Sequence, residues 1–377
     1  MVFLGTFLLL LAGIASCALV VPQGGRRWWC LTGTLAMLVT TGFALNEGWG
    51  RSLLLDAAGF AAVALVWSEG TEEAARAAGR FLQLLSVSVV CIVAGLILVG
   101  MAEITPSPPL ARLAVAMLTI GFGLKLALVP FYFWLPAVAG SARPLTTVLI
   151  VSVVDVAAFV ELAHVRLAHP WVFIEWSGVW LTMALCSMLG GALLALAQRD
   201  VKRMLAFSSS DDMGYLLLGL IAGPGLGLSG ALLGALSHAG LKVLLFGAVA
   251  VAEARDHRTV TLDSRGLGGR YPVSAAAFIV GALGMIGVPP TFGFVGRWRL
   301  YLAGVDYGGW WLVLGMMVAT SLALLCYARV IHRVWLGSPD RAERGGEPRL
   351  AAAVLLMLAS LVVLLGVFPA WLTAWLA

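Results

Sequence analysis

The stretch Ile120-Gly-Phe-Gly-Leu-Lys125-Leu-Ala-Leu-Val-Pro130-Phe-Tyr-Phe-Trp134-Leu-Pro136 is almost wholly apolar and carries a single charged residue, Lys125. An ionised side chain at the depth of a bilayer costs roughly 2.5–3.5 kcal/mol on insertion scales, so it persists where it faces a partner or a water-filled path. Pro130 removes a backbone donor and predicts a break in the helix. A buried lysine beside a broken helix is typical of membrane proteins that move ions.

The composition of the whole chain indicates a membrane protein. Of 377 residues, 61% are hydrophobic and 11% are charged, whereas soluble domains carry about 25% charged residues. No long polar segment could form a separate soluble domain, so we expect one polytopic membrane domain over residues 1–377. Residues 1–20 lack a basic start and an obvious cleavage site, which favours a retained first helix over a signal peptide.

Windows of about 20 apolar residues predict an all-α integral membrane protein with about twelve transmembrane helices. The predicted helices lie near 2–21, 28–45, 52–68, 78–101, 111–136, 145–166, 176–197, 203–222, 227–253, 272–303, 307–334 and 350–376. The fifth and tenth are unusually long and contain Pro130 and Pro289-Pro290 respectively. Each is expected to consist of two half-helices joined by an unwound stretch.

Lysine and arginine are distributed unevenly between the connections. The odd-numbered connections hold seventeen of the 24 basic residues, the even-numbered connections hold three, and four lie inside spans. Cytoplasmic connections carry the excess of positive charge in membrane proteins. We therefore expect the odd-numbered connections in the cytoplasm and both termini outside, in a prokaryotic cytoplasmic (inner) membrane. Because the basic residues alternate with apolar spans, the pI of about 9.1 does not indicate nucleic-acid binding.

Ionisable residues inside the spans are candidates for a proton or ion path. They are Asp56, Lys125, Asp155, His238, Lys242 and Arg297, with Asp211 and Asp212 as secondary candidates. His238 and Lys242 are four residues apart and share a helix face. Glu161 and Arg299 lie nearer to helix ends, where a long side chain can reach the interface. Two interpretations stay open: ion pairs that hold helices together, or a path for protons or other ions.

The sequence contains no pattern that binds a redox cofactor or a metal. Its cysteines are scattered through apolar segments without CxxC spacing, at Cys17, Cys30, Cys91, Cys186 and Cys326. A glycine-rich segment at 223–230 is interpreted as a loop and a helix start. We expect no cofactor and no metal in this chain, which would then not be an oxidoreductase by itself.

Four ordered motifs resemble those of a known membrane family. Lys125 to Pro136 resembles K-x-x-x-x-P-x-H-x-W-L-P, and Asp200 to Ser210 resembles D-x-K-R-x-L-A-Y-S-S. His238 to Phe246 resembles H-A-x-x-K-A-L-L-F, and Gly287 to Arg297 resembles G-x-P-P-x-x-G-F-x-G-K. These are motifs of the antiporter-like subunits of respiratory complex I, of membrane-bound hydrogenases and of Mrp-type cation/proton antiporters.

The resemblance implies a fold with two inverted five-helix repeats, each with one broken helix. In this chain we expect two leading helices over 1–45, a first repeat over 52–197 and a second repeat over 203–376.

The resemblance also implies roles for single residues. Asp56 stands where the family has a glutamate that pairs with a central lysine, and Lys125 matches that lysine. Lys242 and His238 fall at linking positions, and Arg297 falls at the terminal position of the path. Arginine keeps its proton, so Arg297 is expected to tune its neighbours rather than to carry a proton.

Three departures from the family pattern affect the path. Tyr132 replaces the motif histidine, Asp211-Asp212 replaces a serine/histidine pair, and Asp155 occupies the position of a second lysine. We predict that Lys125 switches between Asp56 and Asp155, since two carboxylates that compete for one ammonium give two arrangements of similar energy. Lys242, His238 and water are expected to continue the path toward Arg297.

The expected function is that of a proton- or sodium-translocating antiporter-like subunit in a redox-driven complex similar to complex I. The parent would be of the NADH-quinone oxidoreductase or membrane hydrogenase type, with other membrane and redox subunits as partners and no nucleic acid. One alternative is the membrane subunit of an inorganic-carbon uptake complex with a zinc-containing soluble partner. Another is a structural subunit that braces a membrane arm without pumping.

Overall fold

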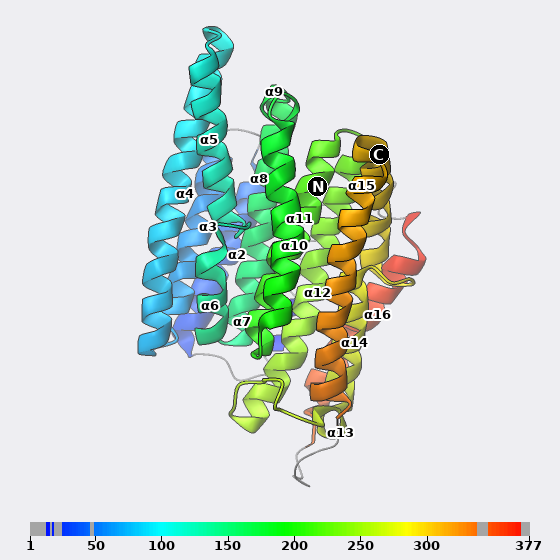
Figure 1. Cartoon of the computed structure of the whole chain (residues 1–377). Coiled ribbons are helices and arrows are strands. Elements are labelled where there is room, and N and C mark those ends of the chain that lie inside the picture. Colours follow the sequence, from blue (N-terminus) through cyan, green and yellow to red (C-terminus); the bar gives the residue numbers. More distant parts are fainter. Residues whose placement is uncertain (1–12, 16, 19–24, 46–48, 338–345, 371–377) are drawn as a thin grey trace.

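The computed structural model describes residues 13–15, 17–18, 25–45, 49–337 and 346–370. These residues form long helices that run side by side (Figure 1). Within them no β-strand occurs, and a single bridge pairs Asp200 with Thr261. Most of the predicted helix near 2–21 lies outside the described residues, and so does the end of the predicted helix near 350–376.

Most helices of the bundle follow the predicted spans closely, but a helix over 292–330, with a kink at Gly309, covers the end of the predicted span 272–303 and most of 307–334. In chain order they are α2 (Arg26–Ala44), α3 (Trp49–Trp67), α4 (Glu72–Ile104), α5 (Pro108–Lys125), η1 (Tyr132–Trp134), α6 (Leu135–Ser141), α7 (Pro144–Val148), η2 (Leu149–Val154), α8 (Asp155–Ala168), α9 (Trp171–Ile174), α10 (Ser177–Ala197), α11 (Val201–Ala222), α12 (Leu226–Asp256), α13 (Leu267–Arg270), α14 (Pro272–Ile286), α15 (Phe292–Val330), η3 (Ile331–Trp335) and α16 (Arg349–Val367). The η1 segment is a 3₁₀-helix, whereas η2 and η3 are π-helical.

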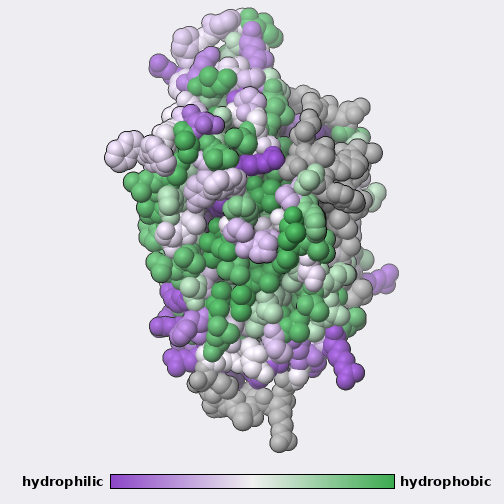
Figure 2. Space-filling model, turned by 90° about the vertical axis from the view of Figure 1, so that its right-hand side faces the viewer, coloured by the Kyte–Doolittle hydropathy of each residue, from purple (hydrophilic) through white to green (hydrophobic). Residues whose placement is uncertain are grey.

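The surface of the bundle is that of a multi-pass membrane protein. Seven helical segments in the described part are long and apolar enough to cross a bilayer, so the all-α membrane fold is confirmed but the count of twelve spans is not. Figure 2 shows a broad hydrophobic band across the middle of the face, with hydrophilic residues toward both ends. The segment 144–168 and α12 are buried around almost their whole circumference, whereas α4 and α16 are mostly exposed.

Two helices are interrupted at the prolines. The helix α5 ends at Lys125, and Val129-Pro130 follows with a cis peptide bond before η1 begins. The helix α14 ends at Ile286, and a cis Pro289-Pro290 bond precedes α15. Lipid cannot satisfy the backbone groups that such breaks release, so protein groups must.

Side chains supply these partners at both breaks. The Nε1 of Trp134 donates to the Leu124 carbonyl at 2.8 Å, and the Val129 amide donates to Ser187 Oγ at 3.0 Å. At the second break the carbonyl of Met285 accepts from Arg297 at 2.8 Å. Each unwound stretch is therefore tied to its own surroundings by at least one polar side chain.

Glycines let the central helices approach closely. A Cβ atom added at Gly191 on α10 would lie 2.5 Å from the backbone nitrogen of Asp211 on α11. A Cβ atom at Gly214 on α11 would lie 2.7 Å from the backbone of α10. The contact between α10 and α11 thus depends on the absence of side chains at these positions.

We predict that Gly191→Ala destabilises the protein by about 1–3 kcal/mol, the usual cost of overpacking a tight contact. Gly178→Ala on the same helix is the matched control, since a Cβ there meets nothing within 4 Å. The midpoint of thermal unfolding in detergent measures both variants. Equal midpoints for Gly191→Ala and the native protein would contradict the close α10–α11 contact.

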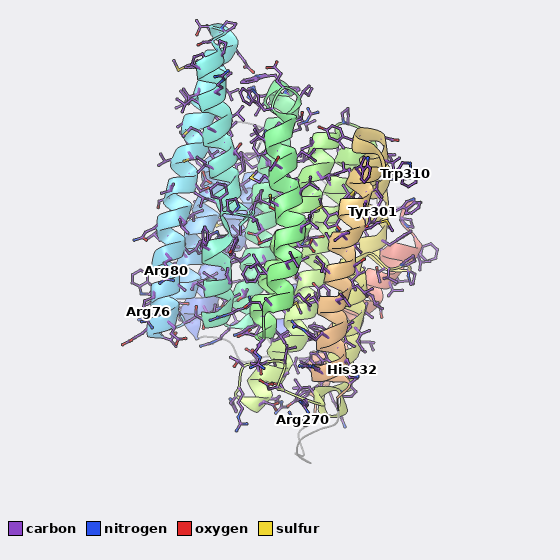
Figure 3. The ribbon with its side chains drawn as sticks, viewed as in Figure 1. Arg76, Arg80, Arg270, Tyr301, Trp310 and His332 are labelled. Atoms are coloured by element: carbon purple, nitrogen blue, oxygen red, sulfur yellow. The ribbon has the colours of Figure 1, made fainter. Side chains whose placement is uncertain are left out.

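Basic residues gather at one end of the bundle. Arg76, Arg80 and Arg270 lie toward the end that also holds His332, while Trp310 lies toward the other end (Figure 3). Arginines from α4 and α13, which are far apart in the sequence, thus lie toward the same end of the bundle.

We predict that the end with Arg270 faces the cytoplasm. A cysteine at position 258 should then react with an impermeant thiol reagent from the cytoplasmic side alone, and a cysteine at position 105, in the α4–α5 connection at the opposite end, from the outside alone. The exposed native Cys30 and Cys186 are first replaced by serine. The reverse labelling pattern would overturn the predicted orientation.

Candidate functional site

Three helices meet at the ammonium group of Lys125. This residue is the last of α5, directly before the first helix break. Its Nζ donates to the carboxylate of Asp56 on α3, and to Oε2 of Glu161 on α8 at 2.6 Å. All three side chains are buried, with residue exposures of 3–5%. A charge at this depth is therefore held by two carboxylates from two other helices, as a buried ion pair requires.

The second carboxylate differs from the predicted one. Glu161 was expected near a helix end, within reach of the interface, and this was wrong because it is buried and contacts Lys125. Asp155 is fully buried, and neither of its oxygens has a hydrogen-bond partner among the described residues. Positions 155 and 161 point about 120° apart on a helix with 3.6 residues per turn. Asp155 therefore cannot share the direction in which Glu161 meets Lys125.

A second cluster lies at the other helix break and joins three helices. His238 Nδ1 on α12 is 2.8 Å from Oδ2 of Asp212 on α11, and Oδ1 of Asp212 accepts from Arg297 at 2.7 Å. His238 Nε2 is 3.1 Å from the carbonyl of Val151 in η2. Both ring nitrogens thus face acceptors. Either the ring holds two protons or Asp212 holds one, so the pair contains one transferable proton.

Arg297 spans the second break. It stands in the first turns of α15 and also donates to the carbonyl of Met285, in the last turn of α14. Its guanidinium carbon lies 3.7 Å from the centroid of the Tyr215 ring, a cation–π contact. Arg297 is thereby fixed by a carboxylate, a carbonyl and an aromatic face. A cavity of about 10 Å³ beside Asp212 and Ser237 has room for about one water molecule.

Lys242 forms a third buried centre, one helical turn beyond His238. It is fully buried, and its Nζ donates to the Leu205 carbonyl and to Ser208 Oγ, both at 2.6 Å. The Tyr327 hydroxyl donates to the same Ser208 oxygen at 3.0 Å. Lys242 is therefore held by neutral oxygens, in contrast to Lys125, which is held by carboxylates.

The predicted path residues thus fall into separate groups. Asp56 and Lys125 are in contact, and so are His238, Asp212 and Arg297. Lys242, Asp155 and Asp211 make no ion pair within the described part of the chain, and Asp211 Oδ1 is buried there without a hydrogen-bond partner. The continuous segment 144–168 touches both contacting groups, through Val151 at one cluster and Glu161 at the other.

Two further buried ionisable groups were not predicted to belong to a site. Glu161 lies inside the predicted span 145–166, flanked by Phe-Val and Leu-Ala, and this apolar setting was the available signal. Lys202 belongs to the second motif, and its buried Nζ lies 3.3 Å from Glu253 and donates to the Ala142 carbonyl at 3.0 Å. Nothing in the sequence indicated that Lys202 and Glu253 would pair. In the described residues no cluster of three His, Cys, Asp or Glu side chains could hold a metal ion.

The motifs and the fold agree with comparisons to known proteins. Residues 72–323 match the family described as NADH:quinone oxidoreductase/Mrp antiporter, transmembrane. The chain is 36% identical over 284 residues to NADH-quinone oxidoreductase subunit N of Desulforudis audaxviator, covering 69% of this chain and 55% of that protein. It is 30% identical over 272 residues to F420H2 dehydrogenase subunit N of Methanosarcina mazei, covering 69% of this chain and 55% of that protein. The chain thus spans a little over half the length of these relatives.

Solved structures share the fold over nearly the whole chain. A chain of the archaeal membrane-bound sulfane sulfur reductase superposes with a TM-score of 0.85 and 25% identity, covering 98% of this chain and 79% of that chain. A chain of respiratory complex I from Thermus thermophilus superposes with a TM-score of 0.79 and 26% identity, covering 97% and 83%. The motifs, the match over residues 72–323 and the shared fold lead to one conclusion: the chain belongs to the NADH:quinone oxidoreductase/Mrp antiporter family of membrane proteins.

Proposed function

We propose that this chain is an ion-translocating, antiporter-like subunit of a complex similar to complex I. The observation that carries the proposal is the buried Lys125, held between carboxylates at a break in its helix. A purely structural ion pair needs only one carboxylate. It also does not need an interrupted helix, because a continuous helix can hold the lysine. A lysine with two carboxylates at an interrupted helix has alternative partners and a backbone that can rearrange.

The mechanism follows from which groups can change charge. Lys125, Asp56 and the His238–Asp212 pair can each take up or release a proton, whereas Arg297 keeps its charge. A proton that reaches the first cluster alters the partners of Lys125. The segment 144–168 touches both clusters, so a shift of this segment would reach His238 through the Val151 carbonyl. Lys242 and water would complete the connection, and Arg297 would stay beside the His238–Asp212 pair as a fixed positive charge.

The named relatives support a redox-driven parent complex. Their names, NADH-quinone oxidoreductase and F420H2 dehydrogenase subunit N, belong to subunits of multisubunit enzymes. On this basis the partners of the chain would be other membrane subunits and redox subunits, in a prokaryotic cytoplasmic membrane. The redox chemistry would take place in those partners, and the transported ion would be a proton or a sodium ion.

One observation favours a bracing role as the second candidate. Arg297 stands at the terminal position of the path and cannot release a proton under physiological conditions. Its three contacts would suit a fixed joint between α11, α14 and α15.

Co-purification of the native complex identifies the parent complex. Iron–sulfur or NiFe subunits would indicate a redox pump, and a zinc-containing soluble subunit would indicate inorganic-carbon uptake.

We predict that Lys125→Ala abolishes translocation through this subunit, because the group that exchanges partners is removed. The change also leaves Asp56 and Glu161 without their cation, at about 3–5 kcal/mol for one broken buried pair. The number of ions moved per catalytic turnover of the reconstituted complex is measured, together with the amount of assembled complex. The control, Arg270→Ala, removes an ion pair with Asp256 of 2.6 Å at the end of the bundle. A fully assembled Lys125→Ala complex with an unchanged ratio would identify the subunit as a brace.

A further inference from the structure

The cluster around Lys125 contains more negative than positive groups. Asp56 and Glu161 both reach the one ammonium, and the cluster is buried among α3, α5 and α8. With all three groups ionised the cluster carries a net charge of one negative unit. A buried net charge is unfavourable, so the cluster favours the uptake of one further cation.

The two oxygens of Glu161 differ in their surroundings. Oε2 accepts from Lys125 at 2.6 Å, whereas Oε1 is buried without a hydrogen-bond partner among the described residues. A proton on Oε1 would neutralise the carboxyl group while Oε2 stays beside Lys125. The geometry thus separates the oxygen that holds the lysine from the oxygen that is open to a proton.

We propose that Glu161 is the second carboxylate of the Lys125 switch and that it carries the transported proton. This inference rests on the proposed function, and it assigns to Glu161 a role for which Asp155 was the sequence-based candidate. The proton binds to Glu161, which becomes a neutral acid. Lys125 then keeps Asp56 as its one charged partner, and the cluster becomes neutral. When the proton leaves, Glu161 is again a carboxylate and shares Lys125 with Asp56. A single proton is gained and lost, and no electron is transferred.

The position of Glu161 connects this step with the second cluster. Glu161 and Val151 belong to the continuous segment 144–168, and the π-helical residues Leu149–Val154 include the carbonyl that faces His238. π-helical turns inside α-helices occur frequently at functional sites. A small shift or rotation of this segment, when the charge of Glu161 changes, would change the contact at His238.

The seam between α3 and α8 stays polar beyond the switch. One turn after Glu161, His164 Nε2 lies 2.9 Å from Arg51 on α3, and His164 Nδ1 lies 2.7 Å from the Val160 carbonyl. From His164 the helix α8 continues to Ala168 and leads into α9, which lies at the end of the bundle opposite to α13 (Figure 1). The charged groups that face Glu161 are therefore Lys125 from α5 and Asp56 from α3, followed outward by Arg51 and His164.

The test compares isosteric variants in the assembled, reconstituted complex. Glu161→Gln keeps the volume but cannot carry the proton, so the ion-transport rate should fall by about a hundredfold, the low end of losses for a removed proton-transfer group. Glu161→Asp should retain a substantial rate. Glu103→Gln is the matched control, because Glu103 is an exposed carboxylate that pairs with His169 outside the clusters. The pH dependence of transport is recorded for all four proteins, and the residual activity of Glu161→Gln should lack one titration step.

The outcomes separate this inference from the proposed function. If Glu161→Gln transports at the native rate with the native pH profile while Lys125→Ala is inactive, Glu161 does not carry the proton, although the subunit still pumps. If both variants assemble and transport normally, the proposed function itself fails. Loss of transport in Glu161→Gln with an unchanged pH profile of the residual activity would also overturn the inference, since it would indicate a role in packing alone.

Discussion

The architecture depends on how the ammonium group of Lys125 is satisfied inside an apolar bundle. A buried cation needs counter-charges in direct contact, because the surrounding protein solvates it poorly. Asp56 and Glu161 supply these charges from α3 and α8, and Trp134 holds the carbonyl of Leu124 at the adjoining break. One charged group thus links three helices at the end of the first half-helix.

The two helix breaks are similar in form but differ in chemistry. Each places a basic side chain next to an unwound stretch, Lys125 at the first and Arg297 at the second. Lysine can lose its proton when its surroundings change, whereas arginine remains charged. The first break therefore holds a centre that can change state. The second holds a fixed positive charge, beside which the shared proton of His238 and Asp212 can move.

Much of this arrangement was predictable from the sequence. Pro130 and Pro289-Pro290 marked both breaks, and the ordered motifs placed Lys125, His238 and Arg297 in one family pattern. Apolar windows also located most helices, since hydropathy depends on composition rather than on packing. The number of spans, by contrast, depends on how each helix sits in a bilayer, which length and composition do not determine.

The second carboxylate that contacts Lys125 was not predictable, for a physical reason. The choice between Asp155 and Glu161 depends on the direction in which each side chain leaves the segment 144–168. The π-helical stretch Leu149–Val154 changes that direction, and its residue pattern does not predict a π-helix. The hydropathy windows placed Glu161 near a helix end, but its side chain directly contacts Lys125 in the buried cluster.

The balance of buried charge extends the argument from the Lys125 cluster to the groups around His238 and Lys242. In these three places the buried carboxyl groups are those of Asp56, Asp155, Glu161, Asp211 and Asp212, and the cations are Lys125, Lys242 and Arg297, whereas the other buried cations, Lys202 and Arg166, lie outside them. Two carboxyl groups are therefore in excess, and a buried carboxylate without a cation is neutralised by a proton more readily than it stays charged. His238 can take up part of this excess. Clusters of this composition favour bound protons, and the position of those protons among their carboxyl groups is the variable that a translocation cycle can change.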